Sequence, residues 1–179
     1  MSCPIVTSLS KGCRDARGGI EIIYVTEWAN ISQTTITEAS GVITNSGSSF
    51  LTTGKKFWTI QVEQFTANDV WNINSNRATG TTSYDPNLNI YIPKRQASVN
   101  QFVKTLALND LAFIVKDNNG TYWLLGRAKG MAMVPSTAPS ATQMSGEQTG
   151  YVLAFNGMEA DFPLEVPSAL ITYLLSPAS

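Results

Sequence analysis

The chain has 179 residues, of which 43% are hydrophobic and only 14% charged, so it can form one domain with a sizeable core but not two independent ones. With 12 Lys and Arg residues, 13 Asp and Glu residues and a net charge of -1, it offers no basic surface for binding DNA through its phosphates. It has no histidine and 2 cysteines, which argues against an enzyme of the familiar kinds, a metal site or a cofactor.

The N-terminal residues, 1–17, show no hydrophobic periodicity, so we expect an arm that runs along a surface. The arm contains Cys3 and Cys13, which form either a disulfide or two free thiols, and a reducing cytoplasm favours the thiols. No basic segment leads into an apolar one, so no signal peptide is expected. No run approaches the roughly 18 apolar residues that span a bilayer, which predicts a protein without membrane contact.

Short strands are expected after the arm. Two glycines allow a sharp turn before the first strand, over residues 20–26. Two further strands, rich in Thr, are expected over residues 31–37 and 41–44, and a turn follows over residues 45–49.

Residues 55–92 are predicted to form long amphipathic strands, because apolar and polar residues alternate along them. The apolar face, expected in the core, comprises Trp58, Ile60, Val62, Trp71, Ile73, Leu88, Ile90 and Ile92. The opposite face comprises Thr59, Gln61, Glu63, Asn72, Asn74, Asn87 and Asn89. Only Glu63 is charged, whereas a solvent-facing sheet normally carries more Lys, Glu and Arg. The polar face therefore indicates a surface that is covered or enclosed.

One helix is predicted, over residues 94–109, and it follows the last of these strands. Its apolar residues have the i, i+3, i+4 and i+7 spacing of an amphipathic helix: Val99, Phe102, Val103 and Leu106. Together with the strands, this helix predicts a mainly β domain, a β-sandwich or open barrel of antiparallel strands with one packed helix.

The rest of the chain predicts a hairpin and a long loop. Two apolar runs, 111–115 and 122–125, flank an Asn-Gly turn and are expected to form a hairpin buried on both faces. Residues 130–150 are small and polar, which predicts an extended loop that acts in function or in contact with a partner. A strand is expected over residues 151–155, and residues 168–175 form either a strand or a short helix.

No pattern in the chain predicts catalysis. Glu159 and Asp161 are close in sequence, but a carboxylate pair needs a pocket and a raised pKa, which the sequence does not reveal. Residues 126–130 lack the Gly-Lys-Ser/Thr ending of a phosphate-binding loop, so a turn after a strand is expected. The tryptophans lie on predicted strands without a basic patch, which favours core or subunit-contact roles over stacking on nucleic acid.

Three fragments, near the start, in the middle and near the end of the chain, form a common pattern. They are Cys3 and Cys13 followed by the strand after Gly18-Gly19, residues 116–126 around the Asp-Asn-Asn-Gly turn, and residues 149–159. Together they resemble a group of small virion proteins of tailed bacteriophages and prophages, particularly those of Bacteroidetes-type hosts. With the order of elements between them, the resemblance covers most of the chain.

The resemblance implies a tail tube protein or a related ring-forming protein of the tail or neck. Such a protein forms a homo-oligomeric, hexamer-like ring in which the inner strands of the subunits join, and its partners are other tail or neck proteins. It would be located in the virion tail after assembly in the host cytoplasm. The seven polar residues of the 55–92 region would face a lumen through which DNA passes. The N-terminal arm and the 130–150 loop would contact adjacent rings.

Other functions remain as alternatives. A head-to-tail adaptor, a tail terminator and a capsid decoration protein share β-rich folds with tail tube proteins. A more distant alternative is a carbohydrate-binding β-sandwich, which would cluster aromatic residues and carboxylates on loops, whereas most tryptophans here lie on predicted strands. A hydrolytic enzyme is the weakest alternative because histidine is missing.

Overall fold

The computed structural model describes residues 18–32, 35–45, 47–63, 66–139 and 149–176, and it shows a mainly β fold of two sheets with packed helices. This confirms the predicted fold class. The N-terminal arm with Cys3 and Cys13 lies outside the described residues, as do residues 140–148 of the predicted loop. Among the described residues, no helix is both long and apolar enough to cross a membrane.

The two sheets differ in size, and we call them the large sheet and the small sheet. The large sheet has the strand order β2-β3-β11-β8-β7-β1-β4. Its strands are β1 (Ile20–Glu27), β2 (Glu38–Ala39), β3 (Val42–Ile43), β4 (Trp58–Gln61), β7 (Leu111–Asp117), β8 (Tyr122–Leu125) and β11 (Leu164–Glu165). The small sheet has the order β5-β6-β10-β9. Its strands are β5 (Ala67–Asn76), β6 (Thr81–Pro93), β9 (Ala132–Thr137) and β10 (Gly150–Asn156).

Strand β7 lies inside the large sheet, between β8 and β1, and its first five residues are buried. Phe113 belongs to the core on one face of the sheet, whereas Ile114 belongs to the core on the other. This two-sided burial explains why β7 has a continuous apolar run instead of an alternating pattern. Strand β8 pairs with β7 in an antiparallel hairpin, as the Asn-Gly turn predicts.

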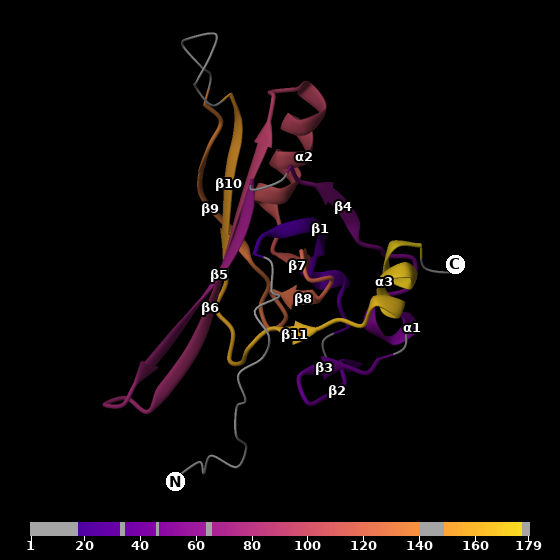
Figure 1. Ribbon diagram of the computed structural model, residues 1–179, viewed down its shortest axis with the longest axis vertical. Coiled ribbons are helices and arrows are strands. Elements are labelled where there is room, and N and C mark those ends of the chain that lie inside the picture. Colours follow the sequence, from indigo (N-terminus) through magenta and orange to yellow (C-terminus); the bar gives the residue numbers. More distant parts are fainter. Residues whose placement is uncertain (1–17, 33–34, 46, 64–65, 140–148, 177–179) are drawn as a thin grey trace.

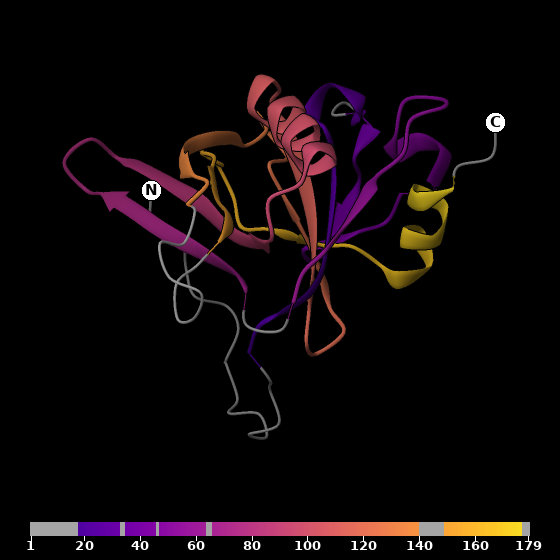
Figure 2. The ribbon, with the colours of Figure 1, turned by 90° about the horizontal axis from the view of Figure 1, so that it is seen from above.

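Two hydrophobic cores lie on opposite faces of the large sheet. One core packs the large sheet against the small sheet and receives Leu106 from the helix α2 (Ala97–Leu108), which lies beside the two sheets (Figures 1 and 2). The other core lies under the helices α1 (Gly47–Phe50) and α3 (Ser168–Leu175). A single 3-10 turn, η1 (Trp28–Asn30), follows β1. Among the described residues, the large sheet is therefore covered on both faces, and the small sheet packs on one face only.

The hairpin of β5 and β6 projects beyond the body of the molecule, as both ribbon views show (Figures 1 and 2). Its two strands pair over ten register positions, from Ala67 opposite Ile90 to Asn76 opposite Thr81. In its distal part the apolar side chains have no core to enter, and Ile73 is 57% exposed. A two-stranded ribbon with such an exposed apolar residue is only marginally stable by itself.

Strand β4 is where the prediction for residues 55–92 is wrong. The alternation suggested strands with a shared face, but β4 pairs with β1 at the edge of the large sheet, whereas β5 and β6 belong to the small sheet. The side chain of Trp58 was expected in the core and is instead 60% exposed. Trp58 is near the start of a short edge strand, where the core face of the sheet is not fully covered. Alternation of apolar and polar residues shows which side chains share one face of a strand, but it does not show which other element covers that face.

Four further elements differ from the sequence-based expectations. The predicted helix 94–109 is shorter at both ends, and helix α1 stands in place of the turn expected over residues 45–49. Helix α3, by contrast, is the short helix that was one of the two expectations for residues 168–175. The predicted loop 130–150 contains strand β9 and the first residue of β10. Residues 31–37 do not form a strand where they are described; Ile31 makes only an isolated bridge with Leu51.

Candidate functional site

The candidate site is the outward face of the small sheet, which we call the amide face. Leu88 and Ile90 of β6 are buried in the core between the sheets, so their neighbours Asn87 and Asn89 point to the opposite side. The strand register places further side chains on the same side. They are Asn68, Val70, Asn72, Asn74 and Asn76 of β5, Thr81, Ser83, Asp85 and Tyr91 of β6, Val152, Ala154 and Asn156 of β10, and Ala132 and Val134 of β9.

Four of the seven residues predicted to line a lumen lie together on this face. Asn72 and Asn74 come from β5, and Asn87 and Asn89 come from the adjacent β6, where Asn87 stands opposite Val70 and Asn89 opposite Asn68. The cross-strand register therefore brings these amides side by side across the hairpin.

The other three predicted residues lie elsewhere. Thr59 and Gln61 alternate with the buried Ile60 on β4, so they point to the face of the large sheet on which α1 and α3 pack. Glu63 follows the end of β4 and is exposed. The seven residues therefore do not share one surface, because β4 and the β5–β6 hairpin belong to different sheets.

The charge of the amide face is low and negative. Asp85 is its one ionisable carboxylate among the described strand positions, and no Lys or Arg belongs to the set. The Asn74 amide donates to one Asp85 oxygen, Oδ2, while the other, Oδ1, is buried without a described hydrogen-bond partner. Asp85 was not among the residues predicted for the polar face, although it continues the two-residue spacing of Asn89 and Asn87 along β6. Asn68 and Val70 continue the β5 alternation from Asn72 in the same way.

A hollow of about 500 Å³ lies on the amide face near the base of the hairpin. Its lining includes Asn72, Asp85, Asn87 and Asn156, with Asp110 and Lys129 beside them. The hollow is polar but has only two acidic groups, and no cluster of three or more metal-ligating acids, cysteines or histidines occurs among the described residues. The hollow therefore exposes amide groups that can hydrogen-bond to water, and its few charged groups do not create a strong positive or negative electrostatic potential.

Both edge strands of the small sheet are free in the described structure. β5 pairs with β6 alone, and β9 pairs with β10 alone. Unpaired edges of this kind are templates for pairing with another chain unless they are shielded. Pro135 shields part of β9, since it has no N–H and lies where the β9–β10 register shifts. The full ten residues of β5 contain no proline.

Glu159 holds the turn 126–130 against the base of the hairpin. Its carboxylate accepts hydrogen bonds from the Ala128 N–H at 3.1 and 3.0 Å, and its backbone forms an isolated bridge with Tyr84. Burial raises the pKa of the Glu159 carboxyl above its ordinary value. Asp161 is exposed, so the two acids do not face a common pocket, and the turn 126–130 follows β8 as predicted.

The fold places the chain among mainly β proteins built from two packed sheets, with one sheet left open on one face. A comparison with protein families, with curated proteins and with solved structures matches none of them.

Proposed function

We propose that the chain is a structural virion protein that forms rings or a stacked tube in a bacteriophage tail and lines a channel through which DNA passes. The observation that carries this proposal is the amide face, whose described strand positions include one carboxylate and no Lys or Arg. A channel wall of this chemistry is hydrated and does not bind the phosphates of passing DNA.

The strand directions favour closure into a ring. Each neighbouring pair in the small sheet is antiparallel, so β5 and β9, the two edges of a four-stranded sheet, run in opposite directions. Rotation about a ring axis keeps strand directions, and β5 of one copy therefore meets β9 of the next in an antiparallel pair. Pairing along Ala132–Val134 of β9 would extend the sheet around the axis and remove both free edges.

The edge groups of β5 that would make this pairing can be assigned. The Tyr91 N–H donates to the Thr66 carbonyl at 2.8 Å, which identifies these two residues as a hydrogen-bonded pair. Because such pairs recur at every second residue of an antiparallel ladder, even-numbered residues of β5 bond to β6. Odd-numbered residues such as Ile73 direct their N–H and C=O groups to the free edge.

The Ile73→Pro variant tests the proposal, with Ile73→Ala as its matched control. Proline removes an edge N–H without removing a β5–β6 hydrogen bond, whereas alanine removes the side chain and keeps the N–H. Negative-stain electron microscopy of the purified wild-type chain should show rings or tubes. We expect the Ile73→Ala variant to assemble as well and the Ile73→Pro variant to remain unassembled.

The same images distinguish the related virion functions. Stacked tubes support a tube subunit, and discrete rings support a head-to-tail adaptor or tail terminator. A wild-type chain that stays monomeric at all concentrations contradicts the ring proposal. Assembly that Ile73→Pro leaves intact contradicts the pairing of the β5 edge, and the capsid decoration alternative then gains support.

A further inference from the structure

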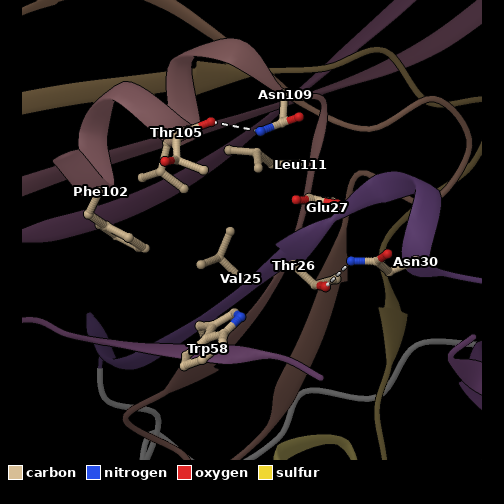
Figure 3. A pocket seen from close by; sticks show the side chains of 10 residues that line it. Val25, Thr26, Glu27, Asn30, Trp58, Phe102, Thr105, Asn109 and Leu111 are labelled. Carbon is tan, nitrogen blue, oxygen red and sulfur yellow. Dashed lines mark hydrogen bonds between the residues drawn. The ribbon is translucent and has the colours of Figure 1, made fainter. Parts of the chain in front are cut away.

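A groove separate from the amide face lies between α2 and the β1–β4 end of the large sheet, with a volume of about 340 Å³. Figure 3 shows Phe102 and Thr105 of α2 on one side of this groove and Trp58 of β4 on the other, with Val25 between them. The volume falls at the lower end of the range of small-molecule sites, roughly 300 to 1,000 Å³. The groove is therefore large enough for one small ligand.

The apolar wall of the groove includes the ring of Trp58, which contributes little to the hydrophobic core because most of its surface is exposed. Trp58 is 60% exposed, although a tryptophan at a strand position normally buries most of its surface. The indole N–H of Trp58 has no hydrogen-bond partner among the described residues. The ring therefore offers a flat apolar face and one free donor to the groove.

The polar lining of the groove supplies acceptors. The amide nitrogen of Asn30 donates to the Thr26 hydroxyl at 3.3 Å, and that of Asn109 donates to the Thr105 carbonyl at 2.9 Å (Figure 3). These bonds fix both amides and leave their oxygens without a partner among the described residues. The carboxylate of Glu27 lines the same groove and likewise has no described hydrogen bond or ion pair.

The charge around Trp58 selects between a cationic and a neutral ligand. The Lys56 ammonium lies 4.2 Å from the centroid of the Trp58 ring, so a cation already interacts with this indole. A second cation would be repelled by it, and an ammonium or guanidinium group has no acceptor for the free indole N–H. A neutral ligand with hydroxyl groups both donates to Glu27 and accepts from Trp58.

From these contacts we infer that the groove between α2 and β4 is a binding site for a pyranose sugar. The C–H groups of one sugar face carry partial positive charge and would stack on the face of the Trp58 ring that Lys56, which does not line the groove, leaves free. The hydroxyl groups on the ring edge donate to Glu27, Asn30 and Asn109. The site needs no second subunit, so it stands apart from the proposed ring and tube.

Saturation-transfer difference NMR tests the site, because it reports on ligand protons whether the chain is monomeric or assembled. The probes are the methyl β-pyranosides of glucose, galactose, mannose and N-acetylglucosamine, each titrated to roughly 50 mM to detect weak binding. We expect saturation transfer to the C–H protons of at least one probe. Trp58→Ala should abolish the transfer, and Glu27→Gln should weaken binding about tenfold, because a charged acceptor is replaced by a neutral one.

The control is Leu108→Ala, which removes an exposed side chain from α2 outside the groove and should leave the transfer unchanged. Circular dichroism verifies that all three variants fold, which is expected because Trp58, Glu27 and Leu108 are exposed. The sugar site is overturned if no probe receives saturation, or if transfer persists in Trp58→Ala. It is also overturned if arginine methyl ester, added as a cationic probe, binds in place of every sugar.

Discussion

The large and small sheets of this chain differ in how their faces are covered. The large sheet has a core on each face, and its interior strand β7 is buried throughout its first five residues. In the part of the chain that the structure describes, the small sheet has one buried face and one open face, and the strand positions of the open face are rich in asparagine and include no Lys or Arg. A surface made only for solubility normally carries many charges of both signs. This contrast is the reason for proposing that the open face acts outside the monomer.

We expect a core position of the large sheet and an exposed position on the projecting hairpin of the small sheet to respond very differently to loss of an apolar side chain. Phe113 of the large sheet is fully buried, and its ring centroid lies 4.9 Å from that of Phe155. Phe113→Ala should lower the free energy of unfolding by about 3–5 kcal/mol, since it leaves a cavity. Ile73→Ala, on the projecting hairpin, should change it by only about 0.5 kcal/mol.

Urea unfolding followed by circular dichroism measures both changes, at a protein concentration at which the wild type is unassembled. Similar losses in the two variants would mean that the hairpin contributes to the monomer core, and the comparison between the sheets would then fail.

Positive charge on the amide face should change DNA binding more than positive charge elsewhere. The Asn72→Lys/Asn89→Lys variant places two ammonium groups on the proposed channel wall. Assembled particles of this variant should bind double-stranded DNA at least about tenfold more tightly than wild type at low salt, and the effect should fall steeply as salt rises. Electrophoretic mobility shifts over a salt series measure this.

The matched control for this prediction is Thr59→Lys/Gln61→Lys, which adds the same charge to exposed positions on the large sheet. Because these positions face away from the amide face, the control should bind DNA less tightly than the Asn72/Asn89 variant. Equal binding by the two double variants would contradict a channel lined by the small sheet.

The smallest expected effect concerns pH and two carboxyl groups beside the small sheet. Burial raises the pKa of Asp69, on the core-facing side of β5, above its ordinary value of 3.8, and that of Glu159 above 4.5. The folded state therefore binds protons more tightly than the unfolded state. As pH rises from these ordinary values through the raised ones, the unfolded chain loses its protons first and the free energy of unfolding falls.

Asp69→Asn and Glu159→Gln should each flatten this decline, and the double variant should flatten it most. Urea unfolding at a series of pH values from about 4 to 7 measures the slope. Parallel curves for wild type and double variant would show that neither acid is protonated more readily in the folded state.

Elements with strong local patterns were predictable from the sequence. The apolar stripe of α2 and the Asn-Gly turn between β7 and β8 both correspond to elements of the structure, because spacing and turn chemistry act over a few residues. The alternation along β5 and β6 also correctly separated Asn72, Asn74, Asn87 and Asn89 from the core. Strand β9 was missed because its six residues lie within a small, polar segment without clear alternation.

The parts of the candidate site that depend on distant pairing were not predictable. Thr59 and Gln61 have the same alternation as the asparagines, but β4 pairs with β1, more than thirty residues earlier in the chain, and so joins the large sheet. Trp58 was assigned to the core by its apolar character, whereas the short edge strand leaves it exposed beside α2. Neither outcome is visible in local spacing, because the choice of strand partner depends on which surfaces the whole chain can bury.

The sequence by itself determined that this chain is a low-charge, mainly β domain with polar strand faces rich in amides, because composition and two-residue alternation are local properties. Only the tertiary structure decided which of those faces form one surface. It separated β4 from the β5–β6 hairpin, left the edges β5 and β9 without a described partner strand, and opened a groove at Trp58. These features depend on strand pairing and coverage between segments far apart in the chain, which local periodicity does not encode.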